Sequence, residues 1–225
     1  MDSESNRSGY RVELVLTIIM AISAVGTAWA GFQSTKWGGV QANSYAQASA
    51  ARTESTRAST EAGQLQTIDV ISFSAWVEAL NTEIIAGTIA APAGSYQPTP
   101  GTGSAFFYHR FRPEFRPAVE AWIAARPLID PAAPQTPFAL PEYRLASGEL
   151  AAQLADRADR HADRASTANQ RADNYVLTAV IFALVLFFAG VAGRAHARIQ
   201  YLMTALAATA LLAALITLAT FPVEV

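Results

Sequence analysis

The sequence predicts an all-α membrane protein: three transmembrane helices, an extracytoplasmic domain built on a helical hairpin or bundle, and a proline-rich aromatic cap. Three observations predict this class: long uncharged apolar runs, small residues at helical spacing that continue beyond two of these runs, and a proline-rich stretch with many aromatic residues. Of the 225 residues, 52% are hydrophobic and 15% are charged. This balance indicates a lipid environment.

Three apolar runs are long enough to cross about 30 Å of hydrocarbon. They cover residues 14–32, 175–193 and 199–221, and none contains an acidic or basic residue. Each run predicts a transmembrane helix. Residues 1–13 then form the N-terminal segment, and residues 194–198 form a short turn between the second and third helices.

Basic residues indicate the orientation of these helices. They precede the first run and occupy the turn between the second and third runs, as Arg7, Arg11, Arg194 and Arg198. The positive-inside bias therefore predicts a cytoplasmic N-terminus, with residues 33–174 and the tail 222–225 outside the cytoplasm. We expect the chain in the bacterial cytoplasmic (inner) membrane, with the lipid bilayer as its first partner. A cleaved signal peptide ending near Ala30 is the alternative for the first run.

Small residues recur at alternating steps of three and four along two stretches. The face predicted on the first stretch includes Ala28, Gly31, Gly38 and Ala46. The face predicted on the second includes Ala162, Asn169 and Gly190. Such faces let helices approach closely in lipid, and in water the spacing is typical of coiled coils. We expect residues 33–63 and 144–174 to pair as an antiparallel hairpin, although an alanine-rich sequence also produces such faces by chance.

Asn169 is the one strongly polar residue of the second face. A lone polar residue of this kind sets register or oligomeric state in some coiled coils. A solvated asparagine at an exposed position is the alternative.

A broad apolar face follows within the helical segment 33–91. At helical spacing it contains Val70, Phe73, Val77 and Leu80. Alanine methyl groups contribute little burial, about 0.8 kcal/mol each, so the alanine-rich hairpin needs a further packing partner. Because one chain offers little to cover this face, we expect a homo-oligomer or a contact with another membrane or envelope protein.

Residues 92–143 are rich in proline but also carry many aromatic residues, which favours an ordered cap over a linker. One short helix is expected, at residues 113–126. Trp122 should be buried, with Phe111 and Phe115 among its neighbours. The segment 144–174 is expected to return to helix.

A sequence pattern in the cap resembles a group of bacterial inner-membrane proteins to which no activity is assigned. The pattern consists of FRPEFRP at 111–117, AW at 121–122 and PFALPEYR at 137–144. The resemblance is most specific over residues 106–146. It implies a membrane topology, and it implies no functional residues.

The chain offers no motif for an enzyme, a metal or a cofactor. It has no cysteine, so disulfides and thiolate sites are excluded. His161 has no carboxylate three or four residues away, so its stretch reads as a solvated charged face. Gly101-Thr102-Gly103 lacks the helix start that a phosphate loop needs, and His109 is expected among structural salt bridges. The basic residues do not gather into a stripe, so the sequence gives no indication of nucleic-acid binding.

Two functions remain open on the sequence. The first is a non-enzymatic, membrane-anchored structural or interaction protein that assembles through its outer helices and small-residue faces. The second is a homo-oligomeric channel or pore, for which a ring of charges or carbonyl groups would be expected near the pore. A secondary transporter is disfavoured, because the three runs contain no ionisable residue away from their ends.

Overall fold

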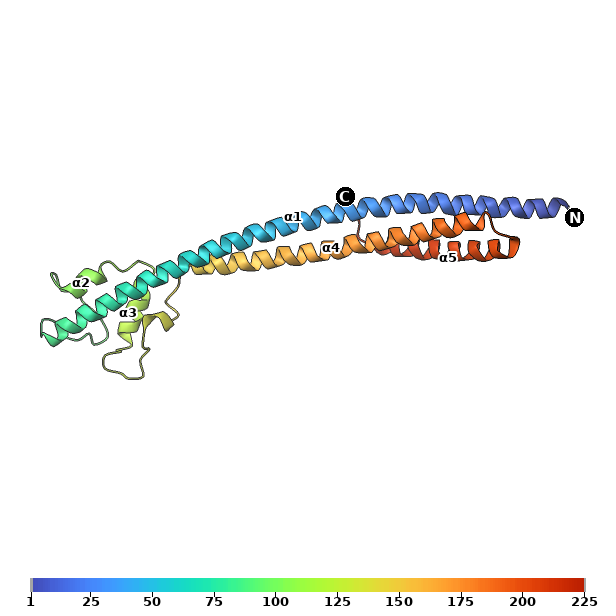
Figure 1. Ribbon diagram of the computed structural model, residues 1–225. Helices are drawn as coiled ribbons and strands as arrows, with labels where there is room; N and C mark the ends of the chain where they lie inside the picture. Colours follow the sequence, from blue (N-terminus) through green and yellow to red (C-terminus); the bar gives the residue numbers. More distant parts are fainter. Residues whose placement is uncertain (1, 225) are drawn as a thin grey trace. The chain divides into compact units, whose positions relative to one another are not determined.

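The structure is a computed structural model that describes residues 2–224, and along these residues it contains helices and no strand. Five α-helices and one short 3-10 helix follow in order (Figure 1): α1 (Asp2–Ile85), α2 (Gly103–Tyr108), α3 (Arg116–Ala124), η1 (Pro137–Ala139), α4 (Ala146–Ala192) and α5 (Ala197–Thr220). Met1 of the predicted cytoplasmic segment and Val225 of the predicted tail lie outside the described residues, as does the side chain of Arg7.

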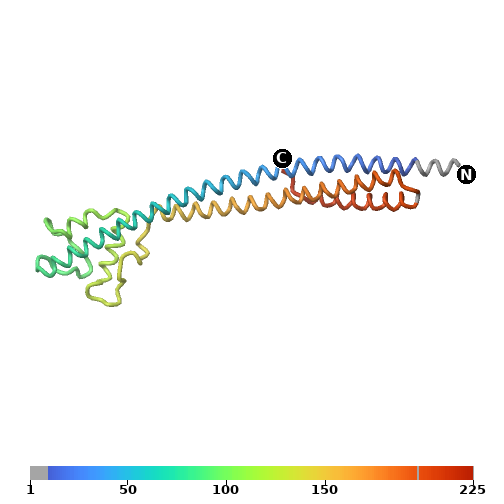
Figure 2. The backbone as a smooth tube through the Cα atoms, in the orientation of Figure 1, coloured from blue at the N-terminus to red at the C-terminus, as the bar shows by residue number. Residues whose placement is uncertain are grey.

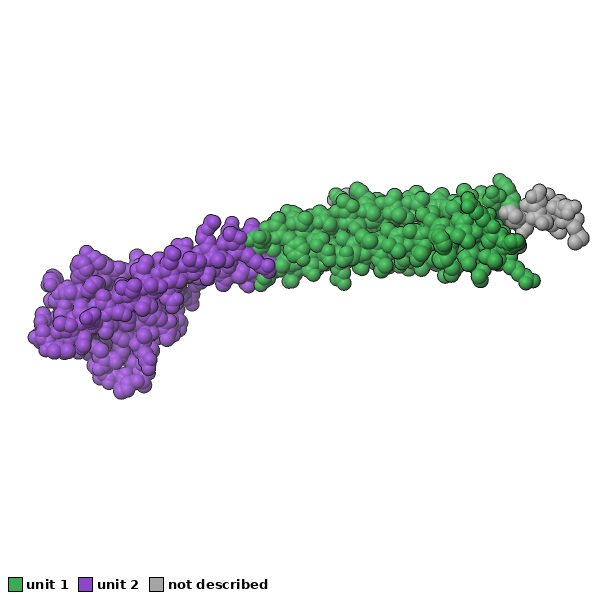
Figure 3. All heavy atoms as spheres, in the orientation of Figure 1, with its two compact units in different colours: residues 1–49, 159–225 green, residues 50–158 purple. Residues whose placement is uncertain are grey.

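Three helices are long and apolar enough to cross a membrane: Tyr10–Ile85, Ala146–Ala192 and Arg198–Thr220. The all-helical class and the three membrane-length apolar helices are therefore confirmed. The chain forms two compact units, which are coloured separately in Figure 3. Unit 1 comprises residues 1–49 and 159–225, and unit 2 comprises residues 50–158.

Unit 1 is built from the first part of α1, the second part of α4, and α5, which the backbone trace shows side by side (Figure 2). One of its cores joins apolar residues of all three helices: Leu16 and Ile19 of α1; Phe182, Val185, Ala189 and Ala192 of α4; Ala207, Leu211 and Ala214 of α5. These positions recur every three or four residues. Each helix therefore presents one face to the others.

The small-residue face predicted on α1 is not the face through which α1 packs in this chain. Ala28, Gly31 and Ala46 are exposed, and Gly38 is only half-buried. The buried face instead contains Ser23, Ala30, Gln33, Trp37 and Ser44. The larger apolar side chains Val25, Trp29 and Phe32 are exposed as well, so they do not set the rotation of α1. The buried face instead fits bulky residues of the partner helices, such as Phe182 of α4, which lies against Gly26.

The face predicted on α4 is buried in one part and exposed in another. Its alanines before the apolar run, including Ala158, Ala165 and Ala172, are buried. Ala162 is half-buried, whereas Asn169 and Gly190 are exposed. Within the apolar run the buried face contains Tyr175, Thr178, Phe182 and Val185, whereas other bulky residues of the run, such as Leu177 and Phe187, are exposed.

At Gly26, α1 leaves no room for a side chain between itself and α4 in unit 1. A Cβ atom added at Gly26 would lie 2.6 Å from Cζ of Phe182, whose side chain is fully buried. Gly26→Ala should therefore destabilise unit 1 by about 1 to 3 kcal/mol through overpacking. Unfolding of the full chain in mixed micelles measures this effect.

Gly31 provides the control, because nothing lies within 4 Å of a Cβ atom added there. Gly31→Ala should leave the unfolding midpoint in place or raise it. Combining Gly26→Ala with Phe182→Leu should recover part of the loss, and equal tolerance of alanine at both glycines would contradict the close packing.

In unit 2, α1 ends earlier than expected, at Ile85 rather than at residue 91. Gly87 has a φ of 68°, a left-handed conformation that glycine adopts at little cost. Its N–H donates to the carbonyl of Ile84 at 3.0 Å, and the N–H of Thr88 donates to the carbonyl of Glu83 at 2.9 Å. This pair of hydrogen bonds is the Schellman motif, which closes the helix.

The proline-rich segment of unit 2 holds two α-helices and the 3-10 helix η1, where one helix was expected. α2 begins at Gly103, and the Thr102 hydroxyl caps it by accepting a hydrogen bond from the N–H of Ala105 at 3.2 Å. The expectation that no helix follows Gly101-Thr102-Gly103 is therefore wrong, although the helix has only six residues. α3 is shorter than the predicted stretch 113–126, and it carries Pro117 in its first turn, where a missing N–H costs nothing.

Candidate interaction site

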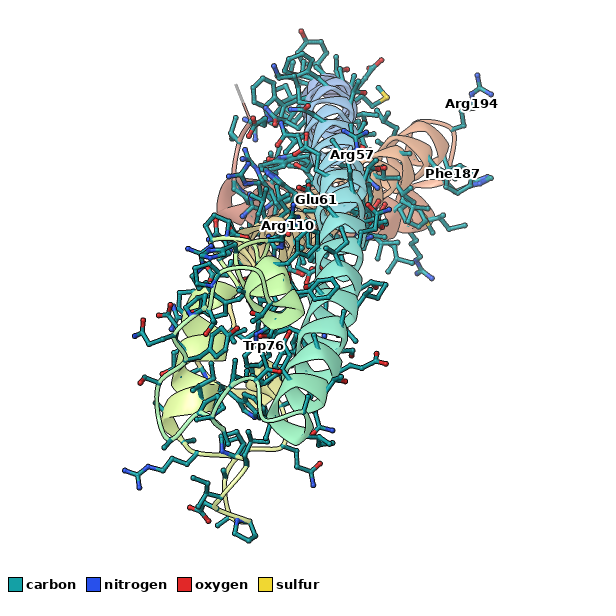
Figure 4. All side chains as sticks on the ribbon, turned by 90° about the vertical axis from the view of Figure 1, so that its left-hand side faces the viewer. Arg57, Glu61, Trp76, Arg110, Phe187 and Arg194 are labelled. Carbon is teal, nitrogen blue, oxygen red and sulfur yellow. The ribbon has the colours of Figure 1, made fainter. Side chains whose placement is uncertain are left out.

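An aromatic core joins the end of α1 to α2, α3 and the loops of unit 2. Trp76 of α1 is fully buried at its centre (Figure 4), with ring centroids of Tyr96 at 5.4 Å and Phe111 at 5.9 Å. Tilted and edge-on ring pairs at these distances contribute beyond simple burial. This core fixes the end of α1 against the segment that follows it.

Most of the apolar residues predicted on α1 contribute to this core. Phe73 and Leu80 are buried in it, and Val77 packs against it from a partly buried position. Val70 lies outside the core and is 41% exposed. The apolar face of this segment is thus covered largely by its own chain, in contrast to the expectation that one chain offers too little.

Trp122 lies where the sequence analysis expected it. It is 6% exposed and belongs to the same core as Phe111 and Phe115. Its ring meets that of Phe73 edge-on at 5.1 Å, and its Nε1 donates to the carbonyl of Pro134 at 2.7 Å. Residues from three separate stretches of unit 2 therefore meet at this side chain.

A buried ion pair lies beside the aromatic core, and the sequence analysis missed it. The Asp69 carboxylate, fully buried, accepts two hydrogen bonds from Arg112, from Nε at 3.0 Å and from Nη2 at 2.8 Å. The Tyr143 hydroxyl donates to the same carboxylate at 3.1 Å. The signal that could have revealed it is a single acid between Ile68 and Val70, on an otherwise apolar face.

The environment of this pair shifts the pKa values of its partners. Hydrogen bonding to Asp69 raises the pKa of Arg112 above its ordinary value, with a further contribution from Glu114. Burial, and then the nearby Asp69 charge, raise the pKa of the Tyr143 hydroxyl. Arg112 therefore stays protonated and the Tyr143 hydroxyl keeps its proton at neutral pH. The bidentate geometry ties α1 to residues far along the chain.

A second polar contact holds α2 to α1. The Ser104 N–H donates to Oε1 of Glu83 at 3.1 Å, and the Ser104 hydroxyl donates to Oε2. The Tyr96 hydroxyl donates to Oγ of Ser104 at 2.7 Å. Burial alone would raise the pKa of Glu83, but the hydrogen bonds from Ser104 and the N–H of Gly103 outweigh it and lower the pKa below the ordinary value for glutamate.

This shift predicts an acid dependence of unit 2. A carboxylate with a lowered pKa in the folded state stabilises the fold above its unfolded pKa, and the contribution is lost as the pH falls through the folded pKa. On acidification below about pH 4.5, the wild-type unfolding midpoint should fall more steeply than that of Glu83→Gln. Parallel curves for the two proteins between pH 6 and pH 3 would contradict the role of Glu83.

Large apolar side chains remain exposed on α1 beside the ion pair. Ile68 is 53% exposed and Ile71 is 64% exposed. One helical turn separates them, so the two side chains are neighbours on the surface. We call Ile68, Val70 and Ile71 the exposed isoleucine surface. Exposed groups of large apolar side chains commonly mark interaction sites.

Three further features of unit 2 bear on possible chemistry: metal-binding groups, the surroundings of His109, and the contact between Tyr108 and Glu120. Among the residues that the structure describes, no group of three or more histidine, cysteine or acidic side chains is placed to hold a metal ion. His109 is not in a salt-bridge cluster; the ion pairs form at Arg112, and the guanidinium of Arg110 stacks 3.4 Å from the ring centroid of Phe106. The Tyr108 hydroxyl donates to Glu120 at 3.1 Å beside an open pocket of about 420 Å³.

No family model, curated protein or solved structure matches this chain. Its class therefore follows from the fold. Along the described residues 2–224 the chain is all-helical, with three membrane-length apolar helices and a second compact unit held by an aromatic core and a buried ion pair.

Proposed function

We propose that this chain is a membrane-anchored, non-enzymatic interaction protein. Its three apolar helices hold it in the bilayer, and residues 33–174 form an extracytoplasmic domain that assembles with further copies of the chain or with another membrane or envelope protein. The exposed isoleucine surface is the observation that carries this proposal. Residues 92–143 act as the cap that stiffens the domain.

The ion pair explains how this surface keeps its orientation. Asp69 is fully buried and held by Arg112, so the helix cannot rotate without exposing an ion pair and the aromatic core. Ile71 follows Asp69 by two residues, which places it about 200° around a helix and turns it outward. The surface is therefore presented in a fixed geometry, and such preorganisation lowers the entropic cost of binding.

Assembly can be tested on the full chain by mass measurement in mild detergent together with crosslinking in native membranes. Ile68→Ser combined with Ile71→Ser should abolish the crosslinked adduct and lower the measured mass. Leu150→Ser is the matched control, because Leu150 is an exposed apolar residue elsewhere in unit 2. A wild-type protein that is strictly monomeric and yields no adduct would overturn the proposal.

The orientation of the chain is proposed from its basic residues and from the resemblance of the FRPEFRP region to inner-membrane proteins. A cysteine at Ser95 should react with an impermeant thiol reagent added to intact cells. A cysteine at His196 should react only after the cells are opened. The chain has no native cysteine, so the background is low. Labelling of both positions in intact cells would contradict this topology.

A channel or pore remains the second candidate, favoured by one observation: the small-residue face with Ala28 and Gly31 stays exposed on α1. It could line a path between copies. Ser23, however, is fully buried within the chain, and its hydroxyl donates to the carbonyl of Ile19 at 2.8 Å. Ion flux through liposomes that contain the purified protein, absent from empty liposomes, would move the assignment to a channel.

A further inference from the structure

Unit 1 contains a polar pocket of about 430 Å³ between α1 and α4, beside the segment that follows α5. α1 contributes Lys36, Gly39 and Ser44, α4 contributes Arg164, and Glu224 closes one side. All of these residues belong to unit 1. Neither the aromatic core nor the exposed isoleucine surface, which both belong to unit 2, uses this pocket.

The wall at Glu224 is held by hydrogen bonds to the backbone. Gln33, fully buried, donates from Nε2 to the carbonyl of Glu224 at 3.1 Å and accepts from the N–H of Glu224 at 3.0 Å. Nε1 of Trp37 and the hydroxyl of Tyr175 both donate to the carbonyl of Pro222, each at 3.1 Å. The pocket is therefore bounded by a fixed segment.

The pocket carries a net positive charge. Within the described part of the chain, Lys36 and Arg164 take part in no ion pair, and Glu224 is the one carboxylate among the lining residues. Two cations and one carboxylate therefore favour an anion in the pocket.

The position of Lys36 along α1 indicates where such an anion comes from. Lys36 follows Phe32, at the end of the first apolar run, by four residues. At 1.5 Å per residue this is about 6 Å, which is the depth of the lipid headgroups next to the hydrocarbon. Trp29, Phe32 and Lys36 follow helical spacing, and the two aromatic rings are exposed, with centroids 5.9 Å apart. An apolar surface thus leads to the pocket.

We propose that this pocket binds the phosphate headgroup of an anionic phospholipid. Lys36 and Arg164 pair with the phosphate. The acyl chains run along Trp29 and Phe32. The inference rests on membrane insertion and is independent of the proposed interaction role, so either can fail alone.

Lipid binding is measured by native mass spectrometry of the full-length protein in a neutral detergent, with phosphatidylglycerol or phosphatidylcholine added. Phosphatidylglycerol should bind more tightly. Replacing both Lys36 and Arg164 with glutamine should weaken its binding by about fivefold for each cation removed. Gly39→Leu should also reduce binding, because nothing lies within 4 Å of a Cβ atom at Gly39 and the new side chain enters the pocket without straining α1.

Two control variants separate this site from general lipid association. Gly38→Leu changes an equally open glycine that does not line the pocket, and Arg160→Gln removes an exposed cation elsewhere on α4; both should bind phosphatidylglycerol as the wild type does. Equal binding of the two lipids, or wild-type binding by Gly39→Leu, would overturn the proposal. Displacement of phosphatidylglycerol by millimolar inorganic phosphate would overturn the lipid assignment and show a site for free anions.

Discussion

Replacing Arg112 with methionine should destabilise unit 2 by about 3 to 5 kcal/mol. The change leaves the fully buried Asp69 carboxylate with only the Tyr143 hydroxyl as a hydrogen-bond partner. An uncompensated buried charge is far more costly than the loss of a surface ion pair. Denaturant unfolding of the full chain, followed by tryptophan fluorescence, measures the effect because Trp76 and Trp122 both lie in this unit.

Two further variants make this prediction specific. Glu114→Gln removes the other carboxylate that pairs with Arg112; Glu114 is exposed, so the cost should stay below about 1 kcal/mol. Combining Asp69→Leu with Arg112→Met should recover most of the lost stability, because an apolar pair needs no charge compensation. A cost below about 1 kcal/mol for Arg112→Met alone would show that the ion pair does not hold α1 in place.

Replacing Trp122 with alanine should cost about 3 to 5 kcal/mol of unfolding free energy. The ring fills the core next to Phe73, and its N–H satisfies the carbonyl of Pro134. The loss therefore combines a cavity with an unpaired acceptor. The same unfolding experiment reports it, and the proline-rich segment should become sensitive to protease.

Phe106→Ala is the matched control, because Phe106 is an exposed aromatic residue of the same segment whose ring contacts Arg110 and Phe107 and lies outside the aromatic core. Its cost should stay below about 1 kcal/mol. Rapid proteolysis of the native wild-type protein between residues 92 and 141 would show instead that this segment is a linker.

The membrane helices could be predicted because their signal is local. A run of uncharged residues longer than the hydrocarbon is thick needs no knowledge of the rest of the chain. The apolar spacing of Phe73, Val77 and Leu80 was likewise sufficient to predict a helix with one buried face, since it follows the helical repeat. Trp122 is a large aromatic residue within a short helix, and its burial also follows from its neighbours in the sequence.

The rotation of α1 could not be predicted from its small residues. An alanine-rich helix carries small side chains on more than one face, so Ala28 and Gly31 on one side compete with Gly26 and Ala30 on another. The choice depends on which side the bulky residues of the partner helices fill. Phe182 of α4 lies over Gly26, and no sequence pattern within α1 indicates that contact.

Local sequence patterns were sufficient to predict a helical protein, three helices long and apolar enough to cross a membrane, and a proline-rich segment with aromatic residues suited to a core. The pairing of Asp69 with Arg112, the hydrogen bonds between Gln33 and Glu224 and the outward position of Ile68 and Ile71 are instead consequences of the tertiary fold. Apolar runs act through local periodicity and transfer free energy, which a sequence displays. Asp69 and Arg112 are 43 positions apart in the sequence, and Gln33 and Glu224 are 191 positions apart. Hydrogen bonds over such separations depend on which distant segments the fold brings together, and no local pattern displays this.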